Sequence, residues 1–157
     1  MPAAVASDIV SPIGTFASVV AGSPATYDAA GFAAKFDGTE KEIGLLEDFT
    51  IPESSTSVET FNNMKDGTII KVMTFTDAGE ASITSAHVID DDGQVILISH
   101  HNGPEKTQPV SIMLSHSDGS KTYYSGKVSG YAPVKNPLNR VTYTIAVDEK
   151  MVEVVAP

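Results

Sequence analysis

The sequence contains no cysteine and no tryptophan, and its first basic residue is Lys35. Without cysteine the chain has no disulfide, no thiolate nucleophile and no thiolate ligand for a metal. The apolar stretch at 16–22 has no basic flank and is too short to be a signal segment or a membrane span. A chain of 157 residues is expected to form one domain around one hydrophobic core.

Positive charge is also scarce, because ten basic residues face twenty acidic ones, for a net charge of −10. The whole excess lies between residues 37 and 92, which hold thirteen acids and three lysines. Two interpretations are open. The acids form an ordinary solvated face, or they form a surface that repels a negatively charged partner such as nucleic acid. A protein that binds nucleic acid would normally carry the opposite charge.

Alternating apolar and polar residues predict β-strands through much of the chain. In the final third, Asp118 and Gly119 predict the turn of a hairpin, because this pair tolerates the positive φ of a tight turn. Segment 23–41 consists of small and turn-forming residues and is predicted to be irregular. Segment 68–75 is apolar and β-branched and by itself resembles a strand. Strands are expected at 15–22, at 42–51 with an extension at 54–61 after Pro52, at 80–89, within 108–132 as the hairpin, and at 139–154.

The stretch IDDDGQVILISHH, residues 89–101, is ambiguous between a metal site, a buried strand and a helix. Its acids lack the spacing of a calcium loop, and the adjacent His100 and His101 would point about 100° apart on a helix, so they are poor chelators. Asp91 can cap a helix, with Gln94 as its capping-box partner, and 102–104 is a stop. We therefore predict a helix of about three turns here.

Five stretches along the chain form one pattern, and they are VVAGSPATYDAAGFAA, IGLLEDFTIP, ITSAHVIDDDGQ, VSIMLSHSDGSKTYYSGKVSG and VTYTIAVDEKMVEV. Together they resemble the major tail tube proteins of long-tailed bacteriophages. The resemblance spans nearly the whole chain in order, and its most specific part is the first stretch. It implies a mainly β subunit with a β-sandwich or barrel-like fold and one short flanking helix.

The resemblance also implies a function. Such subunits form rings, usually six-fold, that stack into the hollow tail tube through which DNA is delivered. The implied partners are further copies of the chain and the tape measure, tail terminator and tail tip proteins. The implied location is the virion tail, after assembly in the cytoplasm of the bacterial host. No cofactor, metal or membrane contact is implied.

Two segments are expected to join subunits. Residues 62–79 correspond to a long excursion that packs on a neighbour in the resembling family, and an ordinary buried strand is the alternative. Residues 1–11 have little to bury, and we expect them to form a flexible arm that becomes ordered in the tube and joins one ring to the next. The apolar residues expected at the inter-subunit contact of the first segment are Ile69, Ile70, Val72, Met73 and Phe75.

The acidic middle of the chain is expected to line the lumen in part. DNA must slide through a tube without being held, and a wall of Lys or Arg would bind its phosphates. The alternative is that the acids meet the six bases beyond residue 92 on an adjacent subunit. A slip of one residue in strand register would exchange the two faces. The candidates for the lumen wall are Glu42, Glu47, Glu53, Glu59 and Glu80.

The sequence leaves one alternative class of protein open and argues against another. A secreted or particle-surface β-sandwich that binds carbohydrate fits the strands, but six Phe, five Tyr and no Trp offer no evident stacking platform for a sugar. An enzyme is not expected, because the sequence has no nucleophile-elbow, zinc-protease or phosphate-loop motif. Tyr123 and Tyr124 are adjacent and are expected to face opposite sides of a strand.

Overall fold

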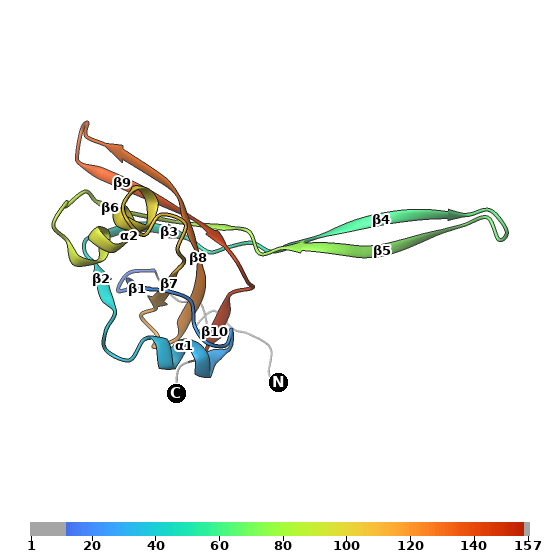
Figure 1. Ribbon diagram of the computed structural model, residues 1–157, viewed down its shortest axis with the longest axis horizontal. Coiled ribbons are helices and arrows are strands. Elements are labelled where there is room, and N and C mark those ends of the chain that lie inside the picture. Colours follow the sequence, from blue (N-terminus) through green and yellow to red (C-terminus); the bar gives the residue numbers. More distant parts are fainter. Residues whose placement is uncertain (1–11, 156–157) are drawn as a thin grey trace.

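The computed structural model describes residues 12–155, and these residues form ten strands and two short helices (Figure 1). The elements follow one another as β1 Phe16–Ala21, α1 Ala29–Lys35, β2 Lys41–Ile43, β3 Leu46–Thr50, β4 Ser55–Asn63, β5 Thr68–Asp77, β6 Glu80–Ala86, α2 Asp92–Asn102, β7 Val110–Ser115, β8 Lys121–Val134, β9 Arg140–Val147 and β10 Val152–Val154.

Eight of these strands form one antiparallel sheet that is rolled on itself. Its order is β2-β1-β7-β8-β9-β6-β3, with β10 beside β8. The two strands at the ends of this order, β2 and β3, are joined by only Gly44 and Leu45. The two edges of the sheet must therefore approach each other. This arrangement confirms the prediction of a mainly β, sandwich- or barrel-like fold.

The hydrophobic core lies inside the rolled sheet. Successive side chains of a strand point to opposite faces, so every second side chain of each strand points into this core. On β9, Val141, Tyr143 and Ile145 are fully buried, whereas the residues between them are half-buried on the outer face. Leu97 of α2 is also fully buried and belongs to the same cluster. The helix packs against β1, β2 and β8, so it completes the core rather than lying apart from it.

The start of α2 confirms one part of the prediction and corrects another. Asp91 caps the helix, because its side chain accepts a hydrogen bond of 3.2 Å from the Gln94 N–H. Gln94 is not a capping-box partner. Its buried amide donates to the Ala86 carbonyl at 2.7 Å and accepts from the Val88 N–H at 3.3 Å. Burial of the side chain decides this, since the amide must satisfy groups of the core rather than the exposed helix end.

A second helix, α1, lies in the segment predicted to be irregular. Asp28 caps it by accepting from the Gly31 N–H at 2.7 Å, and the same carboxylate accepts from the Thr26 hydroxyl. These two hydrogen bonds, chiefly the one from Gly31, lower the pKa of the Asp28 carboxyl. The fully buried Phe32 stacks on Tyr123 with ring centroids 5.3 Å apart. A helix of seven residues is marginal alone, so packing against β8 stabilises it.

Two predicted strands are interrupted. The strand expected at 42–51 splits into β2 and β3 at Leu45, whose φ is 53°, outside the range of an extended strand. The closing strand expected at 139–154 ends at Val147, and β10 follows after a short link. The predicted hairpin is confirmed as β7 and β8, with Gly119 at a φ of 90° in the turn. Tyr123 and Tyr124 do face opposite sides, but both are buried, in two different clusters.

Candidate assembly interface

Strands β4 and β5 form a separate two-stranded ribbon, called the arm from here on, that projects from the rolled sheet (Figure 1). The N-terminal arm predicted at residues 1–11 is a different segment and lies outside the described residues. Every residue of the two strands is exposed except the half-buried Asn63. An isolated two-stranded ribbon is at best marginally stable in water. The arm therefore has the form of an element that is stabilised by contact with something else.

Apolar side chains occur on both faces of the arm. Residues paired across an antiparallel ladder point to the same side. Val58 pairs with Met73 on one face, and Phe61 pairs with Ile70 on the other. An antiparallel sheet with one face in water would normally be polar on that face. Each face of the arm thus has apolar surface that a partner can cover.

The five apolar residues predicted to contact a neighbouring subunit all lie on β5 and are all exposed. Whether they contact a neighbour remains a prediction. The excursion differs from the predicted loop at 62–79, because it is a hydrogen-bonded ribbon that begins at Ser55. The exposed fractions are 65% for Ile69, 45% for Ile70, 50% for Val72, 75% for Met73 and 84% for Phe75.

The root of the arm is fixed to the rolled sheet. Gly79 has a φ of 90°, and a side chain at this position would collide with the backbone of Glu53. Its N–H donates to the Asp77 carboxylate at 2.9 Å, and its carbonyl accepts from the Val147 N–H at 3.0 Å. Glycine is therefore required where the two strands of the arm leave the sheet, and the direction of the arm is set there.

A second surface is rich in hydroxyl groups. The outward faces of β3, β6 and β9 carry small polar side chains that bond to one another across the strands. Thr84 and Thr142 are joined by 3.1 Å between hydroxyl oxygens, and Thr50 and Ser82 by 2.9 Å. We call this surface the hydroxyl face, and it comprises Thr50, Ser82, Thr84, Thr142 and Thr144.

Two of the five predicted lumen residues lie on the hydroxyl face. Glu80 pairs with Ala146, so it points to the same side as Thr142 and Thr144. Glu47 lies at a bulge of β3, and its carboxylate accepts from Arg140 Nε at 2.6 Å. This pair is partly exposed, so it adds little to stability.

The other three predicted lumen residues lie elsewhere. Glu42 pairs with Ser18, which points to the side of the sheet that α1 covers. Glu59 lies on the arm, and Glu53 lies in the exposed link before it. The five glutamates do not share one face. The register of β2 and the departure of the arm separate them, and neither was evident in the sequence.

The histidines take part in local hydrogen bonds rather than in a metal site. His87 Nε2 lies 2.9 Å from the Tyr131 hydroxyl, and His116 Nε2 lies 2.8 Å from the Thr122 hydroxyl. His100 is buried within α2. In residues 12–155, no group of three or more His, Cys, Asp or Glu side chains is placed to hold a metal ion. In the same residues, no helix is long and apolar enough to cross a membrane.

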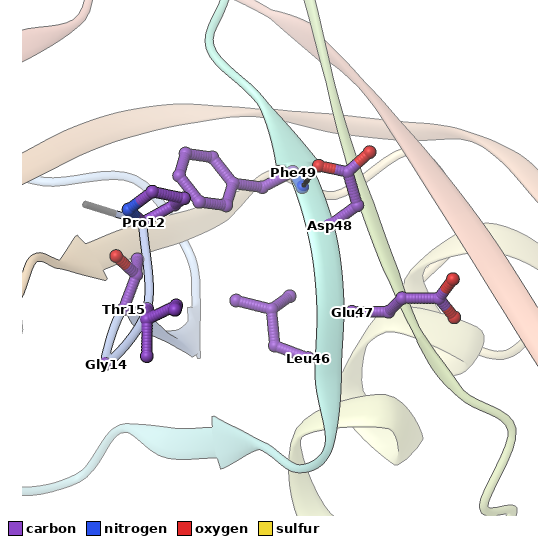
Figure 2. A pocket seen from close by; sticks show the side chains of 8 residues that line it. Pro12, Gly14, Thr15, Leu46, Glu47, Asp48 and Phe49 are labelled. Atoms are coloured by element: carbon purple, nitrogen blue, oxygen red, sulfur yellow. Dashed lines mark hydrogen bonds between the residues drawn. The ribbon is translucent and has the colours of Figure 1, made fainter.

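An open pocket of about 370 Å³ lies between β3 and the segment before β1 (Figure 2). Leu46 and Phe49 point toward Pro12 and Thr15, whereas the carboxylates of β3 point away (Figure 2). The Thr15 hydroxyl is buried and lacks a hydrogen-bond partner within the described residues. The pocket arises because β2 pairs with β1 while β3 pairs with β6, which leaves a seam between them.

Comparison with known proteins gives likeness in structure but not in sequence. No family model matches the chain, and no curated protein matches it. A chain in the cryo-EM structure of the anti-feeding prophage baseplate, 6-fold symmetrised, has a TM-score of 0.57 and 8% identity, over 87% of this chain and 91% of that one. A chain in the cryo-EM structure of the anti-feeding prophage tube terminating cap has a TM-score of 0.60 and 10% identity, over 99% and 97%.

The likeness establishes the fold. Because the match to the cap structure covers 99% of this chain, it includes the arm as well as the rolled sheet. The two neighbours belong to the baseplate and the tube terminating cap of the anti-feeding prophage, and neither is the tail tube of a long-tailed phage.

Proposed function

We propose that this chain is a structural subunit of a phage tail-like particle and that copies of it assemble into stacked rings, six-fold in symmetry, around a hollow tube. The observation that carries the proposal is the arm. It exposes apolar side chains on both faces and is anchored at its root by Gly79. A subunit that donates such an element to a different surface of the next copy makes a heterologous contact, which generates rings or filaments.

The proposed partners are other copies of the chain and the tape measure, terminator and tip proteins of the same tail. The chain has no catalytic role in this function. It is assembled in the cytoplasm of the bacterial host and remains in the tail of the particle. The fold shared with components of a prophage baseplate and cap supports this setting.

We further propose that the hydroxyl face forms part of the wall of the tube. Its central side chains are neutral, and the charged groups at its border include Glu80, Asp48 and the Glu47–Arg140 pair. Such a wall would not bind DNA phosphates, and its acidic groups would repel them. Binding requires cationic side chains, which neutralise phosphates and release the counterions condensed on the DNA. Glu42 and the arm residue Glu59 are not part of this wall.

The test is assembly of the purified chain. Mass measured against concentration should show growth from monomer to rings, and negative-stain microscopy should show rings and tubes. A variant with Phe61, Val72 and Phe75 each changed to serine should keep the stability of the monomer, since these side chains are exposed, and should lose assembly. A variant with Thr60 and Thr68, also on the arm, each changed to serine is the matched control. A wild-type chain that stays monomeric at every concentration would contradict the proposal.

The likeness to the tube terminating cap favours a second candidate function, in which the chain closes the end of a tube. A terminating subunit forms one ring and stops, because one face of its ring does not accept another ring. The same micrographs separate the two functions. Stacked rings of indefinite length support the tube subunit, and single rings that do not stack support the cap.

A further inference from the structure

The turn at the tip of the arm holds Met64 in an exposed position that the turn itself does not require. Asn63 donates to the Asp66 carboxylate at 3.2 Å and accepts from the Lys65 N–H at 3.1 Å. Gly67 has a φ of 66°. Asn63, Asp66 and Gly67 therefore build the turn. Met64 is 95% exposed, the highest value among the large apolar side chains of residues 12–155.

The pocket in the seam lies at the other end of the arm. It opens beside Leu46 and Phe49 of β3, and β3 leads into β4 through residues 51–54 (Figure 2). The nine residues of β4 span about 30 Å, at roughly 3.4 Å per residue. A chain therefore cannot place its own Met64 in its own pocket. Any methionine from an arm that fills this pocket comes from a second copy.

The tip and the pocket are complementary in chemistry. Methionine is unbranched and flexible, so it can fill an irregular gap such as the one beside Leu46 and Phe49, whose opposite wall includes the side chain of Thr15. Lys65 follows Met64, and the carboxylates of Glu47 and Asp48 lie on the opposite side of β3 from the pocket (Figure 2). Arg140 already pairs with Glu47.

Asp48 is the acid that remains for Lys65. Its exposed carboxylate accepts a hydrogen bond only from the N–H of Phe49, at 2.8 Å, among the bonds found in the described chain. A lysine that crosses the edge of β3 at the seam can therefore pair with Asp48 while the preceding methionine lies on the side of the strand that carries Leu46 and Phe49. Met64 thus matches the pocket side of β3, and Lys65 matches the side that carries Asp48.

We propose that Met64 of one copy inserts into the seam pocket of the next copy, with Lys65 paired to Asp48 across the edge of β3. This inference deepens the proposed function and rests on it, since it requires that the chain self-assembles. The contact joins the tip of one arm to the root of the next. The contact is heterologous, since it joins two different surfaces. Each copy therefore offers one free tip and one free pocket to further copies, and the contact can repeat.

Disulfide trapping tests the contact cleanly, because the chain has no cysteine of its own. The variant Met64→Cys with Leu46→Cys, oxidised after assembly, should give a ladder of covalent dimers, trimers and larger products. The matched control, Met64→Cys with Ala33→Cys on the exposed face of α1, should give only monomer. Assembled material that yields no ladder from the first variant overturns the inference and leaves the proposed function standing. Wild-type chain that does not assemble overturns both.

Charge reversal keeps the inference testable if the cysteine variant does not fold. Lys65→Glu and Asp48→Lys should each raise the concentration needed for assembly by about tenfold, as expected for the loss of a charged contact worth roughly 1.4 kcal/mol. The two substitutions together should restore assembly to near the wild-type concentration. A double variant that assembles no better than the single ones shows that these two residues do not meet.

Discussion

The hydroxyl of Tyr143 donates a hydrogen bond of 3.1 Å to Oε1 of Gln94, a residue 49 positions earlier in the chain. Through this bond β9 is tied to the first turn of α2. The same amide holds the end of β6 through Ala86 and Val88, and the cap residue Asp91 also accepts from the Gly44 N–H at 3.3 Å. The start of α2 thus ties β9, the end of β6 and the link between β2 and β3 to one another.

Replacing Gln94 with alanine should strongly destabilise the monomer. The amide is fully buried, and its loss leaves a cavity and three polar groups without their partner. We expect the free energy of unfolding to fall by about 2–4 kcal/mol in urea titrations. Gln108→Ala, at an exposed position, is the control and should change the value by less than about 0.5 kcal/mol. Equal effects of the two substitutions would contradict the role given to Gln94.

Two buried tyrosines should respond in opposite ways to loss of the hydroxyl. The hydroxyl of Tyr124 is buried and has no hydrogen-bond partner in the described part of the chain, whereas that of Tyr143 donates to Gln94. Tyr124→Phe should leave stability unchanged or raise it by up to about 1 kcal/mol, and Tyr143→Phe should lower it by about 1–2 kcal/mol. Thermal or urea unfolding of the pair decides the point, and a marked loss in Tyr124→Phe would show that its hydroxyl has a partner.

Stability should fall in alkali because of the same two tyrosines. Burial raises the pKa of both phenols above the ordinary value of 10.0. Below pH 10 both states of the chain keep the proton, so the raised pKa has no effect. Above pH 10 the unfolded chain ionises first and is favoured, by up to about 1.4 kcal/mol per pH unit for each group. Tyr124→Phe should make the decline between pH 10 and 11 shallower, and an unchanged slope would contradict this.

The strands of the rolled sheet could be predicted because their alternation is local, and α2 because Asp91 and the acids around it are a local helix start. Helix α1 could not, since its seven residues depend on the stacking of Phe32 on Tyr123, a contact across the fold. The role of Gln94 was hidden for the same reason. Its spacing from Asp91 fits a capping box, and only burial turns the amide inward.

The arm was half visible in the sequence. Segment 68–75 by itself resembles a strand, but it is as apolar as a core strand, so nothing local showed that it leaves the sheet. Val58, Phe61 and Met64 were missed as interface candidates for this reason. The lumen residues depended on strand register, and the bulge at Glu47 and the short β2 set that register in three dimensions.

Lysine on the hydroxyl face should make an assembled tube bind DNA. Thr142→Lys places a cation among neutral side chains, and a tube built from it should hold DNA in low salt and release it as salt rises. Ala33→Lys, on the exposed face of α1, adds the same charge elsewhere and is the control. Retention of DNA by filled tubes can be measured across a salt series. Equal retention by the two variants would place the hydroxyl face away from the lumen.

Hydrogen exchange of the arm tests the central claim most directly. Amide exchange is followed for residues 55–63 and 68–77 in dilute monomer and in assembled material, with β7 of the core as the internal reference. We predict rapid exchange of the arm in the monomer, because an unsupported ribbon opens readily, and protection close to that of β7 after assembly. Strong protection of the arm in the monomer, or no gain in protection on assembly, would contradict the claim that the arm is the joint between copies.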